Sequence, residues 1–199
     1  MLDNIIALDK WLFITINGLH TPFFDPIMVF FSKKLVWAPL YLVIVFWLFI
    51  EPVKGSDKKI EIKRREKLFS FLFLTGIILT FAITDSAANI IKDSFERLRP
   101  CHDASLAGLC HLLEGKGGLY GFVSNHASNV FGLALFTSLT FKHKNYSILI
   151  FTWATIVSYS RIYVGKHFPA DVLFGAILGL VLSFLIFKII SYIYKIKRR

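Results

Sequence analysis

Long apolar runs, separated by short polar or charged stretches, dominate this chain from residue 35 onward. A helix needs roughly 20 predominantly apolar residues to cross a bilayer core about 30 Å thick. Five runs approach or reach that length: 35–50, 68–91, 123–141, 146–164 and 170–194. The pattern therefore predicts an all-α, polytopic membrane bundle with about five transmembrane helices.

The first 34 residues carry a different pattern. Their apolar side chains recur at helical spacing, with polar residues elsewhere on the same helical wheel; the apolar positions are Ile5, Leu8, Leu12 and Ile16. Polar and helix-breaking residues follow from Asn17 to Asp25. We expect an amphipathic helix lying in the membrane interface, then a short helix over 25–31. A sixth span is the alternative. A cleaved signal peptide is not expected, because no basic segment or small-residue cleavage site is present.

Composition agrees with lipid as the solvent. Hydrophobic residues make up 55% of the 199 residues, and 21 of them are Phe, whereas soluble domains are about 45–50% apolar. The length leaves no room for a second domain of ordinary size. We expect one integral membrane domain over 1–199, with an interfacial segment at 1–34 and a core at 68–199 that carries the motifs described below.

The net charge of +10 is distributed unevenly. Five spans would place the 51–67 loop, the 142–145 turn and the C-terminal tail on one side, and these segments hold most of the basic residues. The positive-inside rule makes that side cytoplasmic. We therefore expect a multi-pass protein of the bacterial inner (cytoplasmic) membrane, with 92–122 and 165–169 facing the periplasm or the exterior. The charge is a topology signal and not a nucleic-acid footprint, which would need a soluble basic face.

Three polar motifs lie at span ends on that outer side. The first, KDSFERLRP, contains Lys92, Arg99 and Pro100; the second, FVSNHAS, contains Ser124, Asn125 and His126; the third, SRIYVGKHFPAD, contains Arg161, His167 and Asp171. The charge distribution that oriented the spans did not use these motifs. Their placement on one side is therefore an independent indication of a common site.

The cations of these motifs predict a phosphate site. Like charges converge unfavourably unless an anion lies among them. Arginine offers a planar fork for phosphate oxygens, and lysine a compact charge. Ser124 and Asn125 open a helix, whose free N–H groups also favour an anion. The expected phosphate-binding residues are Lys92, Arg99, Ser124, Asn125 and Arg161.

The remaining polar residues suit phosphoryl transfer. Asp171 follows His167 by four positions, within reach if the turn leads directly into a helix at Pro169. A carboxylate on one ring nitrogen fixes the tautomer and makes the other nitrogen a better nucleophile. His126 is left to protonate the leaving oxygen. These residues are not expected to bind a metal, because three nearby cations oppose it, and no cofactor motif is present.

Each residue also has a simpler structural interpretation. Lys92, Arg97 and Arg99 are typical of a basic flank among lipid headgroups, and Arg161 and Lys166 could extend to the same headgroups. The histidines and the acid could cap or pack at helix ends. These separate interpretations do not explain why all the polar groups fall on the less basic side.

The motifs resemble those of the type 2 phosphatidic acid phosphatase family, whose signature is K-x6-RP, then PSGH, then SR-x5-H-x3-D. The first is complete as Lys92, Arg99 and Pro100, and the third as Ser160, Arg161, His167 and Asp171. The second is altered, with Val123 for Pro and Asn125 for Gly. The resemblance covers the chain from about residue 68 onward.

The resemblance implies a helical bundle that uses a phosphohistidine and no metal. His167 would attack phosphorus, Asp171 would orient His167, and His126 would protonate the leaving group. The three cations, Ser124 and the backbone at Asn125 would hold the phosphoryl oxygens. Whether the Asn125 side chain obstructs the phosphate or donates to it is open at this stage.

We therefore expect a phosphatase of a membrane lipid phosphate or diphosphate, with no cofactor. Within the family, undecaprenyl diphosphate and lipid A phosphates suit an outward site; phosphatidylglycerol phosphate and phosphatidic acid stay open. A lipid phosphotransferase with the same phosphohistidine is one alternative, and a non-enzymatic transporter or scaffold for anionic lipids is another. The spans exclude a soluble haloperoxidase. Cys101 and Cys110 form either a disulfide or two free thiols, and the sequence does not indicate an oligomeric state.

Overall fold

The computed structural model describes residues 2–50 and 59–198, and side chains for 3–50 and 67–197. Its α-helices are α1 (Leu2–Gly18), α2 (Phe24–Ser32), α3 (Ala38–Ile50), α4 (Lys59–Phe95), α5 (Asn125–Phe141), α6 (Lys144–Tyr163) and α7 (Pro169–Arg198). Short 3₁₀ helices cover Leu35–Trp37, Pro100–His102 and Ala104–Leu106. The all-α prediction is confirmed for the described residues. Much of the basic 51–67 loop, and Arg199, lie outside them.

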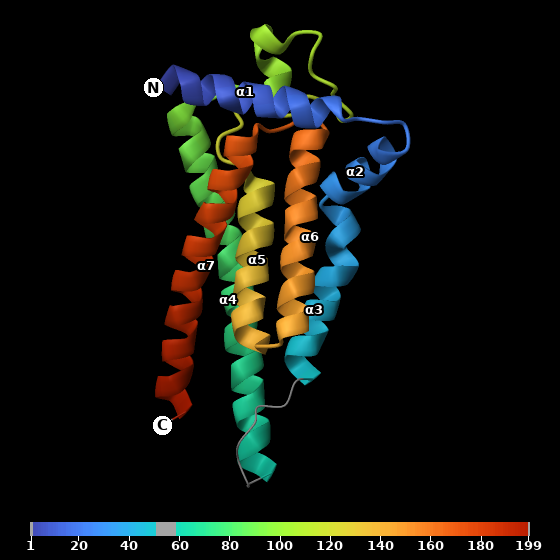
Figure 1. Cartoon of the computed structure of the whole chain (residues 1–199). Coiled ribbons are helices and arrows are strands. Elements are labelled where there is room, and N and C mark those ends of the chain that lie inside the picture. The colour runs from blue at the N-terminus through green and yellow to red at the C-terminus, as the bar shows by residue number, and fades with distance from the viewer. Residues whose placement is uncertain (1, 51–58, 199) are drawn as a thin grey trace.

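Helices α3 to α7 run side by side, and α1 crosses one end of this bundle (Figure 1). The long 96–124 loop lies at the same end as α1, whereas the α5–α6 turn and the C-terminus lie towards the other end (Figure 1). The three sequence motifs therefore gather at the end that α1 covers.

All five predicted spans are helical, but their length and hydropathy do not establish five crossings. Among the described helices, Lys67–Phe95 and Pro169–Lys197 are each long and apolar enough to cross a membrane. The bent pair Phe24–Ser32 and Leu35–Ile50, which meet at 75°, makes a third if the two form one span. Helix α5 has only 17 residues and begins with polar side chains. The five-span count stays a prediction.

Helix α5 lies at the centre of the bundle and packs against α4, α6 and α7. Its Leu133 and Phe136 are buried with Phe73 of α4 and Ile190 of α7 in the main apolar core. Aromatic residues fill much of this core, and the Phe136 ring lies 5.8 Å from the Phe187 ring. The core thus holds α5, whose first residues carry the second motif, in a fixed position.

Glycines allow α7 to approach α5 closely. A Cβ added at Gly179 would overlap the backbone of Ser128, and one added at Gly175 would crowd the backbone of Ser124. Ser183 of α7 donates a 2.7 Å hydrogen bond to the carbonyl oxygen of Gly132. The two glycines therefore serve helix packing, as expected for small residues four apart between membrane helices.

Helix α1 presents a stripe of both polar and apolar residues to the protein. Asp9, Phe13 and Asn17 are all buried, whereas Leu8 is 55% exposed and Trp11 59% exposed. Asn17 donates to the carbonyl oxygens of Tyr163 (2.7 Å) and His111 (2.9 Å), and accepts from the His111 N–H at 2.7 Å. The predicted helix is present, and large apolar side chains lie on its exposed face; its position in the membrane interface stays a prediction.

Candidate active site

A cavity of about 410 Å³ opens at the end of the bundle near α1. It is lined by Lys34, Asp85, Asn89, Lys92, Asp93, Arg99, Gly118, Leu119, Tyr120, Asn125, His126, Arg161 and His167. Six of the eight sequence-predicted site residues are among them. They come from α4, the 96–124 loop, α5, α6 and the turn before α7, so the fold brings together motifs that lie far apart in the sequence.

The arginines of this cavity are held in place by backbone and carboxylate groups. Arg99 donates from Nε to the Tyr120 carbonyl oxygen at 3.0 Å. Arg161 is only 5% exposed; its Nη1 contacts the hydroxyl and carbonyl oxygens of Ser32 and lies 3.4 Å from Glu114 Oε2. Its Nε is buried without a hydrogen-bond partner. Burial lowers the pKa of Arg99 from its usual value, because the charged form has lost solvent. A bound anion would stabilise that charged form.

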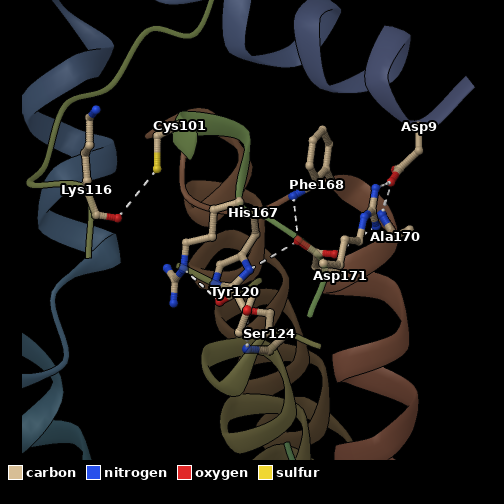
Figure 2. A network of polar contacts seen from close by, with 12 residues as sticks. Asp9, Cys101, Lys116, Tyr120, Ser124, His167, Phe168, Ala170 and Asp171 are labelled. Carbon is tan, nitrogen blue, oxygen red and sulfur yellow. Dashed lines mark hydrogen bonds and ion pairs between the residues drawn. The ribbon is translucent and has the colours of Figure 1, made fainter. Parts of the chain in front are cut away.

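His167 lines this cavity, and the side chain of Asp171 is directed at it from the first turn of α7 (Figure 2). Helix α7 begins at Pro169, directly after the turn, as predicted. The distance from His167 Nδ1 to Asp171 Oδ2 is 3.4 Å, which brings the two groups together but is outside good hydrogen-bond geometry. His167 is 2% exposed and Asp171 is fully buried. The other ring nitrogen of His167 is therefore the one left for a substrate.

The surroundings of His167 keep its ring neutral. Burial is the main cause that lowers the pKa of His167 well below its usual value, and the positive charges of Arg161, Arg99 and Lys92 lower it further. A neutral imidazole has a free lone pair. The arrangement thus suits a nucleophile that an anionic substrate approaches through a ring of cations.

Asp171 has a second partner that the sequence interpretation missed. Arg97 donates from Nη1 to Asp171 Oδ1 at 2.9 Å, and its Nη2 lies 2.5 Å from Asp9 Oδ2 of α1. The sequence reading placed Arg97 in a basic flank among headgroups. Its position two residues before Arg99, inside the first motif, was the available signal. Nothing in the sequence connected Asp9 to the site.

His126 faces the cavity from the first turn of α5. Its Nε2 lies 3.2 Å from the carbonyl oxygen of Ser32, the last residue of α2. Because a carbonyl oxygen can only accept, this contact places a proton on Nε2. That proton is donated to Ser32 in the structure, and the role of His126 as proton donor to the leaving oxygen stays a prediction.

The Asn125 side chain is directed at α4. Its Nδ2 donates to Asp85 Oδ1 at 2.8 Å and to Asn89 Oδ1 at 2.9 Å. Asn129 also donates to Asp85 Oδ1, at 3.2 Å. The amide that replaces the family glycine is thus held by α4, and Asp85 brings a carboxylate to the cavity that the sequence interpretation had not included.

Ser124 lies behind the cavity and is fully buried. It is the N-cap of α5, where its hydroxyl accepts from the Ala127 N–H at 3.5 Å, and its own N–H donates to the Asp171 carbonyl oxygen at 2.9 Å. Its predicted contact with phosphate stays a prediction. In the structure its visible role is to start α5 and join it to α7.

A second cavity, of about 370 Å³, adjoins the first. The two share Lys34, Asp85 and His126. The other walls are mainly apolar and come from α2 to α6: Phe31, Trp37, Tyr41, Phe81, Ala82, Val130 and Val157. A polar cavity thus lies beside a mainly apolar one, and the two share part of their walls.

Two further sequence questions concern the cysteines and metal ions. Cys101 and Cys110 are free thiols, and burial raises the pKa of Cys110 to about 11. Among the residues that the structure describes, no three His, Cys, Asp or Glu side chains are grouped as metal ligands.

Comparisons with known proteins agree on one family. A profile of the PAP2 superfamily matches residues 69–195. The chain is 34% identical over 182 residues to the lipid A 4'-phosphatase of Bacteroides thetaiotaomicron, covering 90% of this chain and 75% of that protein. It is 31% identical over 192 residues to the undecaprenyl-diphosphatase of Sulfolobus acidocaldarius, covering 95% and 82%.

A solved structure has the same fold. The PAP2 type phosphatidylglycerolphosphate phosphatase from Bacillus subtilis superposes with a TM-score of 0.69 at 23% identity, covering 96% of this chain and 88% of that one. The likeness extends over the N-terminal helices as well as the motif-bearing bundle.

Proposed function

The chain belongs to the PAP2 superfamily, and from that premise we propose that it is a metal-independent phosphatase of a membrane lipid phosphate that works through a phosphohistidine at His167. The observation that carries the proposal is the cavity in which Lys92, Arg99 and Arg161 surround His126 and His167. Three cations favour a phosphate group and oppose a metal ion.

In the proposed first step, the free ring nitrogen of His167 attacks phosphorus, and the bond from phosphorus to the lipid oxygen breaks. His126, which enters this step as an imidazolium with a proton on each ring nitrogen, gives one proton to that oxygen and is left neutral, so the dephosphorylated lipid leaves as an alcohol. Lys92, Arg99 and Arg161 stabilise the charge on the phosphoryl oxygens. In the second step His126 takes a proton from water, whose oxygen attacks phosphorus and releases phosphate and free His167.

The adjoining apolar cavity supports a lipid substrate. If the phosphate group is bound among the cations, the lipid attached to it lies beside His126, at the start of the apolar cavity. A hydrocarbon chain buried there gains about 25 cal/mol per Å² of covered apolar surface. A small water-soluble phosphate would leave this second cavity unused.

Among lipid phosphates we propose a lipid A phosphate as the first candidate and undecaprenyl diphosphate as the second. Relatives named for both activities align along most of the chain. Asp85 favours the first candidate, because its carboxylate borders both cavities. A carboxylate accepts hydrogen bonds from sugar hydroxyls and repels a second phosphate group.

We further propose five membrane crossings, α3 to α7, in a bacterial inner membrane, with the cavity facing the periplasm or exterior. The support is the basic 142–145 turn and C-terminal tail at the end opposite the site (Figure 1). Helix α1 would then lie in the outer interface, with its apolar face towards lipid.

Phosphate release from a panel of lipid phosphates in detergent, with EDTA present, tests the proposal. Wild type should release phosphate from at least one lipid, and His167→Ala should release none above background. Lys144→Gln, at the opposite end of the bundle, is the matched control and should equal wild type. Equal background in all proteins would overturn the phosphatase proposal.

A rapid quench with a ³²P-labelled lipid identifies the intermediate. Wild type should carry acid-labile, base-stable label on the protein, and His167→Ala should carry none. Label that passes to a second lipid in preference to water would favour the phosphotransferase. Lipid binding without label or release in any protein would leave the binding scaffold.

A further inference from the structure

We propose that Asp9 of helix α1 is a positioning residue for the His167–Asp171 pair and acts through Arg97. This proposal rests on the proposed function, because it assigns a role within the same site. By this proposal α1, which precedes all three sequence motifs, contributes a residue that supports the active site (Figure 2).

Asp9 uses both carboxylate oxygens on two different elements. Its Oδ2 lies 2.5 Å from Arg97 Nη2, and its Oδ1 accepts from the Ala170 N–H, in the first turn of α7, at 2.9 Å. Asp9 is 6% exposed. Burying a carboxylate costs free energy unless it is paired. The two partners of Asp9 therefore hold its side chain in one position beside the first turn of α7.

Arg97 in turn fixes Asp171. Its Nη1 lies 2.9 Å from Asp171 Oδ1, and its guanidinium carbon lies 4.3 Å from the centre of the Phe168 ring. The N–H of Phe168 donates to Asp171 Oδ2 at 3.0 Å. The carboxylate is thus held from two sides, with Oδ2 directed at His167 Nδ1, 3.4 Å away.

The charge of Asp9 matters as well as its position. The charged groups that act on His167 are mostly cationic: Lys92 from α4, Arg99 from the 96–124 loop, Arg161 from α6 and, through Asp171, Arg97. If Arg97 had no other acidic partner, its whole positive charge would act on the carboxylate of Asp171. Asp171 would then be a weaker acceptor for the N–H group of His167. Asp9 shares that charge and leaves Asp171 able to hold the ring tautomer.

A role in anchoring α1 alone is the competing explanation, and the chain offers a matched control for it. Lys10, the next residue on α1, pairs with Asp103 of the outer loop at 2.7 Å and donates to Ser105 at 2.7 Å. This pair also ties α1 to the protein, but it reaches neither Asp171 nor His167 in the described contacts.

The kinetic test compares Asp9→Asn, Arg97→Gln, the double variant and Lys10→Gln in phosphate release. Asp9→Asn should lower kcat about tenfold with KM nearly unchanged, because the ring is misoriented while phosphate binding is kept. Because Asp9 acts through Arg97, the double variant should equal Arg97→Gln. Lys10→Gln should keep the wild-type kcat.

A second readout does not depend on turnover. In ¹⁵N-histidine NMR spectra, the signal of the Nδ1–H group of His167, assigned by its loss in His167→Gln, should shift in Asp9→Asn and stay unchanged in Lys10→Gln. An unchanged signal in Asp9→Asn, or losses in Asp9→Asn and Arg97→Gln that simply add, would overturn the positioning role. If wild type releases no phosphate but the His167 signal still changes in Asp9→Asn, only the proposed function is overturned.

Discussion

At the scale of single residues, Asn125 explains how this chain tolerates a side chain where the family pattern has glycine. Both donors of its amide are used by α4, on Asp85 and Asn89. The side chain therefore points along the cavity wall, and the backbone N–H at the start of α5 stays available for an anion. The question left open by the sequence is answered by neighbours 36 and 40 residues earlier.

Asn125→Gly should raise KM about three- to tenfold and change kcat little. The loss of the amide frees the Asp85 carboxylate, which then repels the incoming phosphate. Steady-state kinetics on the favoured lipid phosphate measures this. In the Asp85→Asn background the same glycine change should have no effect on KM; an equal rise there would contradict the role given to Asp85.

The pKa of His167 sets a pH dependence. The ring must be neutral to attack, and its pKa lies well below 6.5 because of burial and the nearby cations. The acid limb of kcat/KM for phosphate release should therefore fall below pH 6.5. A limb at or above that pH would contradict the neutral, buried ring.

The same pKa affects stability. Below pH 6.5 the unfolded chain binds a proton at His167 that the folded chain does not, so this residue favours unfolding progressively as the pH falls. The drop in Tm between pH 7 and pH 5 should be smaller for His167→Gln than for wild type. Equal drops in the two proteins would argue against the lowered pKa.

Sequence reasoning named six of the residues that line the cavity, since charge and motif spacing are properties of the chain itself. It missed Asp9, Arg97, Asp85 and Ser32, whose importance depends on which elements meet. Arg97 and Lys92 look alike as basic flanks, yet only the fold decides that Arg97 turns to Asp171 and Lys92 to the cavity.

At the scale of elements, hydrophobic runs predicted the helices well but not their ends. Helix α4 extends to Phe95, beyond the predicted run at 68–91, and α3 starts only after a 3₁₀ turn at Leu35–Trp37. Helix α1 shows why faces are harder to predict than helices. Its buried stripe contains Asp9 and Asn17, which a hydropathy pattern would assign to water.

Gly179→Ala should lower the free energy of unfolding by about 1–3 kcal/mol, because the added methyl group overlaps the Ser128 backbone where α5 and α7 touch. Gly18→Ala, whose added methyl group meets nothing within 4 Å, is the matched control and should shift it by under about 0.5 kcal/mol. Thermal unfolding in detergent compares the two. Similar values would mean that the α5–α7 contact can relax.

At the scale of the whole molecule, the two ends of the bundle differ in chemistry. One end has α1 and the long 96–124 loop, and the other has the 142–145 turn and the C-terminal tail (Figure 1). The sequence predicted this separation from charge because topology signals act on whole loops. It could not predict the paired cavities, which form only where segments from α2 to the turn before α7 meet.

Single cysteines in a background with Cys101 and Cys110 replaced by Ser test the orientation. Lys116→Cys, in the outer loop, should react with a membrane-impermeant maleimide in intact cells. Asn145→Cys, in the opposite turn, should react only after permeabilisation. Both positions are exposed in the structure, so the reverse pattern would place the cavity on the cytoplasmic side.

The two adjoining cavities have a consequence for inhibition. If the phosphate and the hydrocarbon of the substrate occupy separate cavities that meet at His126, a molecule resembling either half can compete with the whole substrate for binding. Inorganic phosphate or vanadate would fill one compartment, and the dephosphorylated lipid the other. The lipid product would then slow the enzyme as it accumulates in the bilayer, and a non-hydrolysable phosphonate on a matching chain would combine both affinities in one molecule.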